Sequence, residues 1–229
     1  MNDEVKLSAL VPMKGNSQRI PHKNIRFLGG KPLCFYILES LEKCDLIKEI
    51  VVNTDSNKII ELLRNKFQKI VVHKRPNFLL GDKVPMTPII EYDLKHIKSD
   101  YFIQTHATNP FLKTETITNA IREFFQGLSD GYDSAIGVTA YRTRFYNKDK
   151  NSINHNPDVM VPSQDMIPIY EDNSNFYINS LENFNKMKNR VGVNPKFIEV
   201  PKLESIDIDE KEDFLLAEAF MDYIRKNNL

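Results

Sequence analysis

The chain has 229 residues, and its 31 lysine and arginine residues balance 31 aspartate and glutamate residues. This length suits one sizeable α/β domain and is too short for two domains of about 150 residues each. The balanced charge creates no global field that would draw the chain to nucleic acid or to an anionic membrane, so we expect neither as a partner. Acidic residues at the N-terminus precede only a short apolar run, which is neither a signal peptide nor a membrane span and favours a cytoplasmic protein.

Short β-branched runs alternate with segments of helical periodicity over the first half of the chain. This pattern is typical of βαβ units around a parallel sheet. Strands are predicted at 7–12, 49–54, 69–73 and 100–106, and helices at 32–44, 56–67 and 87–98. The first helix has Pro32 in its first turn, the second follows Asp55 and the third opens after Thr87, all with the expected capping chemistry. Cys34 and Cys44 lie in the first helix and at its exit, which favours reduced core thiols over a disulfide.

The pattern changes in the second half of the chain. A helix at 114–127 and a strand at 134–141 continue the alternation, but residues 142–173 are polar, rich in Asn and Asp, and contain three prolines. That composition predicts an excursion or hairpin on the surface. Strands at 175–180 and 196–200 and an amphipathic helix at 211–226 complete the prediction.

Three polar stretches follow predicted strands: residues 12–24, 53–55 and 106–110. Ligands of parallel α/β sheets bind beyond the carboxyl ends of the strands, so we expect these stretches to converge at one edge. The first stretch exposes a glycine-containing turn, Gly15, Asn16 and Ser17, among the cations Lys14, Arg19 and Lys23. Such a loop suits a polyphosphate, although a solvated basic turn is the alternative. It is neither a Walker A motif nor a dinucleotide fingerprint, because the required glycine and lysine spacings are missing.

An enzyme that cleaves a triphosphate must neutralise charge on the departing pyrophosphate, and Mg²⁺ usually contributes. The segment "ESIDIDEKEDF" carries Asp207 and Asp209 two positions apart, so both would project to one face of an extended strand. They are candidate metal ligands, although Asp209 with Glu212 also fits a helix capping box. Asp55 is either a helix cap or a nucleotide contact, and His106 is either a ligand contact or a structural histidine.

These motifs, taken in order, resemble the cytidylyltransferases that make CMP-activated nonulosonic acids, including CMP-sialic acid synthetase, with CMP-Kdo synthetases as more distant relatives. The segments that carry the resemblance are "ALVPMKGNSQRIPHKNIRFLGGKPL", "VVNTDSNKI", "RPNFL", "HATNPFL", "NSNFYI" and "ESIDIDEKEDFLLAE". The first and the last are the specific ones.

The resemblance implies a Rossmann-like three-layer α/β/α sandwich with a mostly parallel sheet, in which residues 1–229 form a single nucleotidyltransferase domain. Residues 138–180 would be a small protruding insertion that pairs two subunits of a homodimer and faces the acceptor. The implied nucleotide-binding residues are Lys14, Gly15, Asn16, Ser17, Arg19, Lys23, Asn24 and Arg75. The implied acceptor-binding residues are His106, Asn109, Gln164 and Asn173, and Asp207 and Asp209 would bind Mg²⁺.

The chain also departs from the family pattern at four positions. Lys14 stands where an arginine is usual, and Gln18 replaces a frequent lysine. His106 replaces a glutamine and Ser163 replaces an arginine, both on the acceptor side. The departures leave CTP use credible and leave the identity of the acceptor open.

The resulting hypothesis is Mg²⁺-dependent transfer of CMP from CTP to an anionic sugar acid, with release of pyrophosphate. Lys14 and Lys23 would stabilise the leaving group, and Asp207 and Asp209 would place the metal. The alternatives are a nucleotidyltransferase that uses another nucleoside triphosphate or a sugar 1-phosphate acceptor, and a nucleotide-binding protein without turnover.

Overall fold

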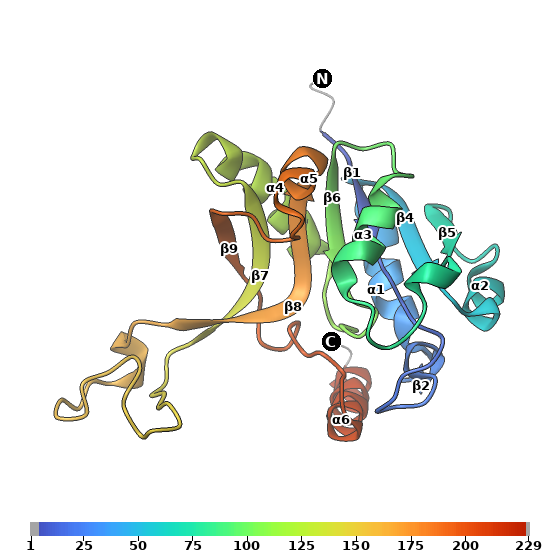
Figure 1. Ribbon diagram of the computed structural model, residues 1–229. Coiled ribbons are helices and arrows are strands. Elements are labelled where there is room, and N and C mark those ends of the chain that lie inside the picture. Colours follow the sequence, from blue (N-terminus) through green and yellow to red (C-terminus); the bar gives the residue numbers. More distant parts are fainter. Residues whose placement is uncertain (1–4, 228–229) are drawn as a thin grey trace.

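A seven-stranded sheet forms the middle layer of the protein in the computed structural model, which describes residues 5–227 (Figure 1). Its strands are β1 (Leu7–Leu10), β4 (Ile47–Thr54), β5 (Ile70–Lys74), β6 (Tyr101–Thr105), β7 (Ser134–Tyr141), β8 (Ile169–Ser180) and β9 (Pro195–Glu199). They lie in the order β5-β4-β1-β6-β8-β7-β9, and β8 runs antiparallel to both of its neighbours while the other pairs are parallel. The predicted, mostly parallel sheet is therefore confirmed.

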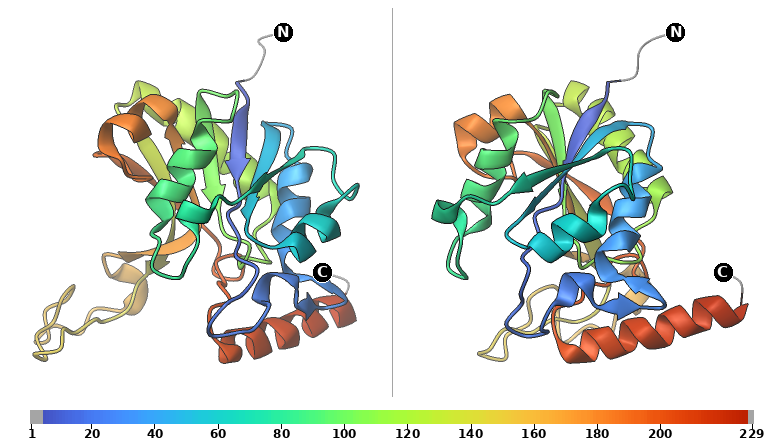
Figure 2. Two further views of the ribbon diagram at one scale, coloured as in Figure 1. Left: turned by 45° about the vertical axis from the view of Figure 1, so that its right-hand side comes forward. Right: turned by 90° about the vertical axis from the view of Figure 1, so that its right-hand side faces the viewer.

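Helices cover both faces of this sheet, as Figure 2 shows from the side. Helices α1 (Leu33–Glu42), α2 (Asn57–Leu63) and α4 (Thr114–Ser129) pack on one face through the largest apolar cluster. Helices α3 (Met86–Leu94) and α5 (Leu181–Met187) pack on the other face, where the rings of Phe102 and Phe184 lie 5.8 Å apart, edge to face. Cys34 and Cys44 are buried and free, as predicted. Coverage on both faces explains why all of β1 and residues 50–54 of β4 are buried, whereas the edge strand β5 stays partly exposed.

The last helix, α6 (Lys211–Asn227), lies apart from these layers, across the carboxyl ends of the strands (Figure 2). It packs against the hairpin of β2 (Phe27–Leu28) and β3 (Lys31–Pro32) through Leu28, Phe214 and Met221. The turn of this hairpin contains Gly29 at φ 56°, where a Cβ would lie only 2.5 Å from Met221 Cγ. Glycine is required there for conformation and for space. This packing places the hairpin of residues 27–32 beside the last helix.

Three predicted helix caps are wrong. Ser56, not Asp55, caps α2, because its hydroxyl accepts a hydrogen bond from Ile59 N at 3.4 Å. Helix α3 begins after Pro85, which places Thr87 inside its first turn. The start of α6 was a candidate for capping by Asp209 with Glu212. It is capped instead by Asp213, whose Oδ2 accepts hydrogen bonds from Asp209 N at 2.9 Å and from Glu210 N at 2.7 Å. Sequence reasoning misplaced these caps because neighbouring Ser, Thr and Asp residues have similar capping preferences.

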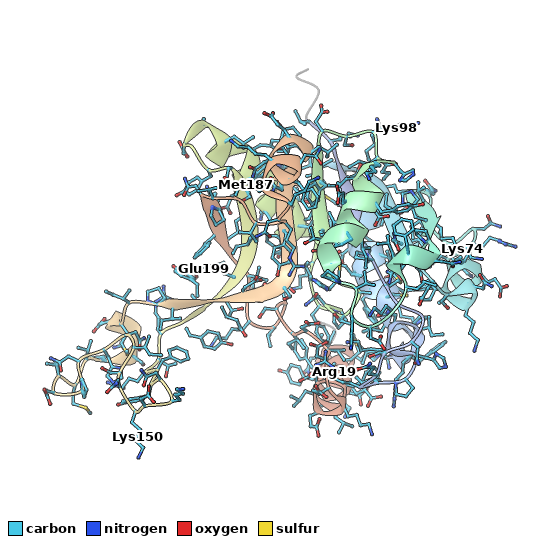
Figure 3. The ribbon with its side chains drawn as sticks, in the orientation of Figure 1. Arg19, Lys74, Lys98, Lys150, Met187 and Glu199 are labelled. Atoms are coloured by element: carbon cyan, nitrogen blue, oxygen red, sulfur yellow. The ribbon has the colours of Figure 1, made fainter. Side chains whose placement is uncertain are left out.

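Residues 142–168 leave the sheet between β7 and β8 and project from the body of the protein (Figure 1). They contain one short 3-10 helix, η3 (Ser163–Asp165), and Lys150 lies near their far end in Figure 3. The flanks of the predicted insertion, 138–141 and 169–180, belong to β7 and β8. Within residues 5–227, no helix combines the length and the apolar character needed to cross a membrane.

Candidate functional site

A cavity of about 440 Å³ opens at the carboxyl ends of β1 and β6. Its walls come from the 12–24 loop, from residues 106–108 after β6, from Asp82 and Ser174, and from Asp207 and Asp209. The predicted meeting of the 12–24 loop with the stretch after β6 is thus observed, and the two acids of the C-terminal segment lie in the same cavity. The segment that carries these acids is irregular rather than a strand.

The first turn of the 12–24 loop is held rigidly by neighbouring residues. Gly15 N donates to Asp55 Oδ1 at 2.6 Å, and Asn24 Nδ2 donates to Lys14 O at 2.8 Å. A Cβ at Gly15 would lie 2.6 Å from Ser56 Cβ, so the loop can pack here only with glycine. The Gly15 amide, predicted to face a phosphate, is therefore engaged by Asp55, while Asn16 and Ser17 line the cavity.

Asp82 holds the cationic side of this loop from across the cavity. Lys14 Nζ donates to Gly81 O at 3.1 Å and lies 3.3 Å from Asp82 Oδ1, while Gln18 Nε2 donates to Asp82 Oδ2 at 2.8 Å. These hydrogen bonds, from Gln18 first and then from Lys14, lower the pKa of Asp82 below its ordinary value. Sequence reasoning missed Asp82, which belongs to none of the quoted motifs.

Lys23 joins the N-terminal loop to the C-terminal acids. Its side chain is 9% exposed, and Nζ donates to Ile208 O at 2.6 Å and to Asp209 Oδ1 at 3.0 Å. Arg19 lies beside the start of α6 (Figure 3) and pairs with Asp209 Oδ2 at 3.0 Å and with Glu210 Oε1 at 2.9 Å. Burial opposes ionisation of Asp209, but hydrogen bonds and charge from Lys23 and Arg19 outweigh it and lower its pKa. Asp209 is therefore a carboxylate at neutral pH.

Asp207 differs from Asp209 in its surroundings. Among the described residues, none donates a hydrogen bond to its buried Oδ1. Burial raises the pKa of Asp207 above its ordinary value, a hydrogen bond from Thr108 opposes that shift, and the charge of Asp209 adds to it. A buried carboxylate oxygen without a hydrogen-bond donor destabilises the folded state, unless a bound ligand or ion contacts that oxygen.

The predicted acceptor residues are scattered. His106 lines the cavity, and burial first, then the charge of Arg190, lower its pKa to about 4, so its ring is neutral at pH 7. Asn173 lines a neighbouring cavity of about 390 Å³, which shares Ser174 and Asp207 with the first one. Asn109 is fully buried, and Gln164 is exposed on the projecting segment. Of the four predicted acceptor residues, only His106 and Asn173 thus line one of these two cavities.

Arg75, the predicted nucleotide contact, is 5% exposed and lies outside both cavity walls as described. Its Nε donates to Asn53 Oδ1 at 2.7 Å, and Asn53 Nδ2 donates to the buried Asp93 at 2.7 Å. Burial lowers the pKa of Arg75, while Asp55 and Asp93 oppose that shift. These observed contacts tie the residue that follows β5 to the end of β4.

The fold and the cavity together define a Rossmann-like α/β protein with a crevice of paired cations and acids beyond its parallel strands, the usual place for a phosphorylated ligand in such sheets. The sequence matches the cytidylyltransferase family over residues 8–226, and the chain belongs to this family. The resemblance drawn from the motifs is thereby confirmed.

Individual relatives agree with this assignment. The chain is 26% identical over 227 residues to CMP-N,N'-diacetyllegionaminic acid synthase of Legionella pneumophila, covering 95% of this chain and 97% of that protein. It is 24% identical over 227 residues to N-acylneuraminate cytidylyltransferase of Streptococcus agalactiae, covering 93% of this chain and 53% of that protein. The chain therefore spans about half the length of some curated relatives that it matches. A solved structure of CMP:2-keto-3-deoxy-manno-octonic acid synthetase complexed with CTP has the same fold, with a TM-score of 0.68, 14% identity, and coverage of 95% and 99% of the two chains.

Proposed function

We propose that this protein transfers CMP from CTP to an anionic sugar acid, a nonulosonic acid or similar 2-keto acid, and releases pyrophosphate. The observation that carries the proposal is the bridge made by Lys23, which joins the N-terminal loop to Asp209 in one cavity. Membership of the cytidylyltransferase family and the names of the relatives support the choice of CTP and of a sugar acid.

The reaction requires an acceptor hydroxyl oxygen to bond to the α-phosphorus while the bond to the β-phosphate oxygen breaks. Negative charge then gathers on the departing pyrophosphate, and the hydroxyl proton is released. Lys14, Lys23 and Arg19 supply positive charge around one cavity, so their function is to orient the triphosphate and to stabilise that charge. Asn16 and Ser17 add polar groups to the same wall.

Asp207 and Asp209 fit a Mg²⁺ site that is completed by the substrate. Among residues 5–227 there is no preformed group of three or more acidic, histidine or cysteine ligands. Mg²⁺ commonly takes one or two carboxylates and fills its other positions with phosphate oxygens and water, so two acids suffice. Oδ1 of Asp207 receives no hydrogen bond from a described residue and is therefore a suitable ligand atom for such an ion. When bound, the ion would neutralise charge on the phosphates.

The test is a matrix of four nucleoside triphosphates against nonulosonic acids, an octulosonic acid and sugar 1-phosphates. Pyrophosphate release is measured with each pair, in Mg²⁺ and in EDTA, and products are identified by mass. We expect a CMP-linked acid from CTP only, and only with Mg²⁺. Preference for another triphosphate, or CTP binding without pyrophosphate release for any acceptor, would overturn the proposal.

We also propose that residues 142–168 pair two copies of the chain into a homodimer. Large apolar side chains stand exposed on this segment, with Met160 at 86%, Ile153 at 58% and Tyr146 at 55% exposure. Exposed apolar groups concentrated on one projecting segment suit a protein interface. Sedimentation velocity of wild type, Met160→Glu and the control Lys150→Glu tests this. A dimer that survives in Met160→Glu, or a monomeric wild type, contradicts it.

A further inference from the structure

Arg190 lies in the loop between α5 and β9, and its guanidinium reaches back to the sheet near the carboxyl end of β6. Its Nη1 donates to Gln104 Oε1 at 2.8 Å, and its Nη2 donates to Tyr177 Oη at 2.9 Å. The guanidinium carbon also lies 3.6 Å from the centroid of the Tyr177 ring. Gln104 and Tyr177 are both fully buried and face each other on β6 and β8. The guanidinium is thus held in one orientation.

The charge of Arg190 is not matched by an adjacent carboxylate. Within residues 5–227 no acid forms an ion pair with it, and the two oxygens that it contacts are neutral. Asp172 is connected only through the Tyr177 hydroxyl, which donates to Asp172 Oδ1 at 2.7 Å. A half-buried cation with neutral partners and further N–H donors is suited to an external anion.

His106 connects this cation to the nucleotide cavity. Its Nε2 lies 3.5 Å from Arg190 Nη1, and its ring lines the cavity that contains Lys23 and Asp209. Because the ring is neutral at pH 7, it does not repel the guanidinium. Arg190 and the Lys23–Asp209 pair therefore act on the same imidazole. Arg190 itself lies outside both cavity walls as described, and His106 is the wall residue that it contacts.

We propose that Arg190 is a specificity-determining residue that binds the carboxylate of the acceptor, with His106 as its neighbour in the acceptor site. The inference rests on the proposed function and deepens it. A planar guanidinium matches a carboxylate through paired hydrogen bonds, which an ammonium does not reproduce. The family pattern leads one to expect an arginine at position 163, but this chain has an uncharged, exposed Ser163 there. Arg190 supplies a cation on the acceptor side that Ser163 does not.

The experiment compares wild type, Arg190→Gln and Arg190→Lys with Lys188→Gln as matched control. Lys188 is a nearby cation on the same loop, but its contact is an exposed ion pair with Glu91. Steady-state constants are measured with CTP, with the sugar acid that gives product, and with the carboxamide of that acid. We expect Arg190→Gln to raise the KM for the acid about 10- to 100-fold, as expected for loss of a charged hydrogen bond, with the KM for CTP unchanged.

The decisive quantity is the preference for the acid over its carboxamide, measured within each variant. This ratio does not depend on how much of the enzyme is folded. It should be large in wild type and in Lys188→Gln, reduced in Arg190→Lys and near one in Arg190→Gln. A wild-type ratio in both Arg190 variants, or an equal rise in the KM for CTP, overturns the assignment of Arg190 while CMP transfer itself stands. If wild type makes no CMP-linked acid, the proposed function fails, and this inference fails with it.

Discussion

The substitution Asp207→Asn should change catalysis and stability in opposite directions, lowering kcat and raising the free energy of unfolding. The wild-type carboxyl has a buried Oδ1 that no described residue contacts as a donor, and the charge of Asp209 acts against its ionisation. Asparagine keeps the shape and removes the charge. A neutral group without a partner is cheaper to bury than a charged one, so we expect the free energy of unfolding to rise by about 1 kcal/mol at pH 7.

The same substitution should nearly abolish turnover. If Asp207 helps to place Mg²⁺ on the triphosphate, loss of its charge should lower kcat at least about 100-fold, the usual scale for removing one electrostatic group from a transition state. The assays are pyrophosphate release across a Mg²⁺ series and urea unfolding of both proteins. Retained kcat would refute the metal role, and a variant that is inactive because it is strongly destabilised would refute the reasoning about burial.

The pH dependence of this comparison has a definite sign. Because the folded pKa of Asp207 is raised, the group favours the folded state below its unfolded pKa, and this contribution is lost as pH rises through the folded value. The stability advantage of Asp207→Asn over wild type should therefore grow from acidic to neutral pH. An advantage that stays constant would mean that the carboxyl has an ordinary pKa.

Three further substitutions test other parts of the site. Lys23→Met should lower the free energy of unfolding by about 1.5–3 kcal/mol through loss of the bond to Ile208 O, and lower kcat about 100-fold; urea unfolding and pyrophosphate release measure both. His106 has its pKa lowered to about 4, so its contribution to stability is present above pH 6.5 and lost as pH falls through 4. The unfolding free energy of wild type minus that of His106→Gln should therefore drop by about 3 kcal/mol between pH 7 and pH 4, and a flat difference would contradict the shift. Gly15→Ala should lower the free energy of unfolding by about 1–3 kcal/mol and raise the KM for CTP, because the new Cβ would clash with Ser56. An unchanged KM for CTP would show that the loop can shift without affecting binding.

The sequence predicted the layers and most of the elements because hydrophobic periodicity is a local signal. The strand at 134–141 and the start of α4 at Thr114 were placed correctly. The helix predicted at 56–67 ends at Leu63, and the strand predicted from 175 begins at Ile169. These ends depend on tertiary contacts, such as the pairing of β8 with β7, which local patterns do not contain.

The placement of Lys23, His106, Asp207 and Asp209 in one cavity was predictable, because each belongs to a recognisable motif. It was not predictable where contacts join unrelated segments. Asp82 reaches Lys14 from a loop before α3, and Arg190 reaches Gln104 and Tyr177 from a loop after α5. Neither residue has a local signal beyond its charge, because each is positioned by the packing of a helix on the sheet.

Arg19 and Lys23 differ in solvent exposure, and this difference suits them to different functions in the cavity. Both pair with Asp209, but the side chain of Arg19 is 51% exposed while that of Lys23 is 9% exposed. An exposed ion pair contributes little to stability, so Arg19 can exchange Asp209 for a phosphate at small cost. Lys23 cannot leave Ile208 O so easily, because its ammonium would remain buried without that acceptor. If the proposed reaction is correct, Arg19 is suited to capture the triphosphate, and Lys23 is suited to hold fixed positive charge where the leaving group develops.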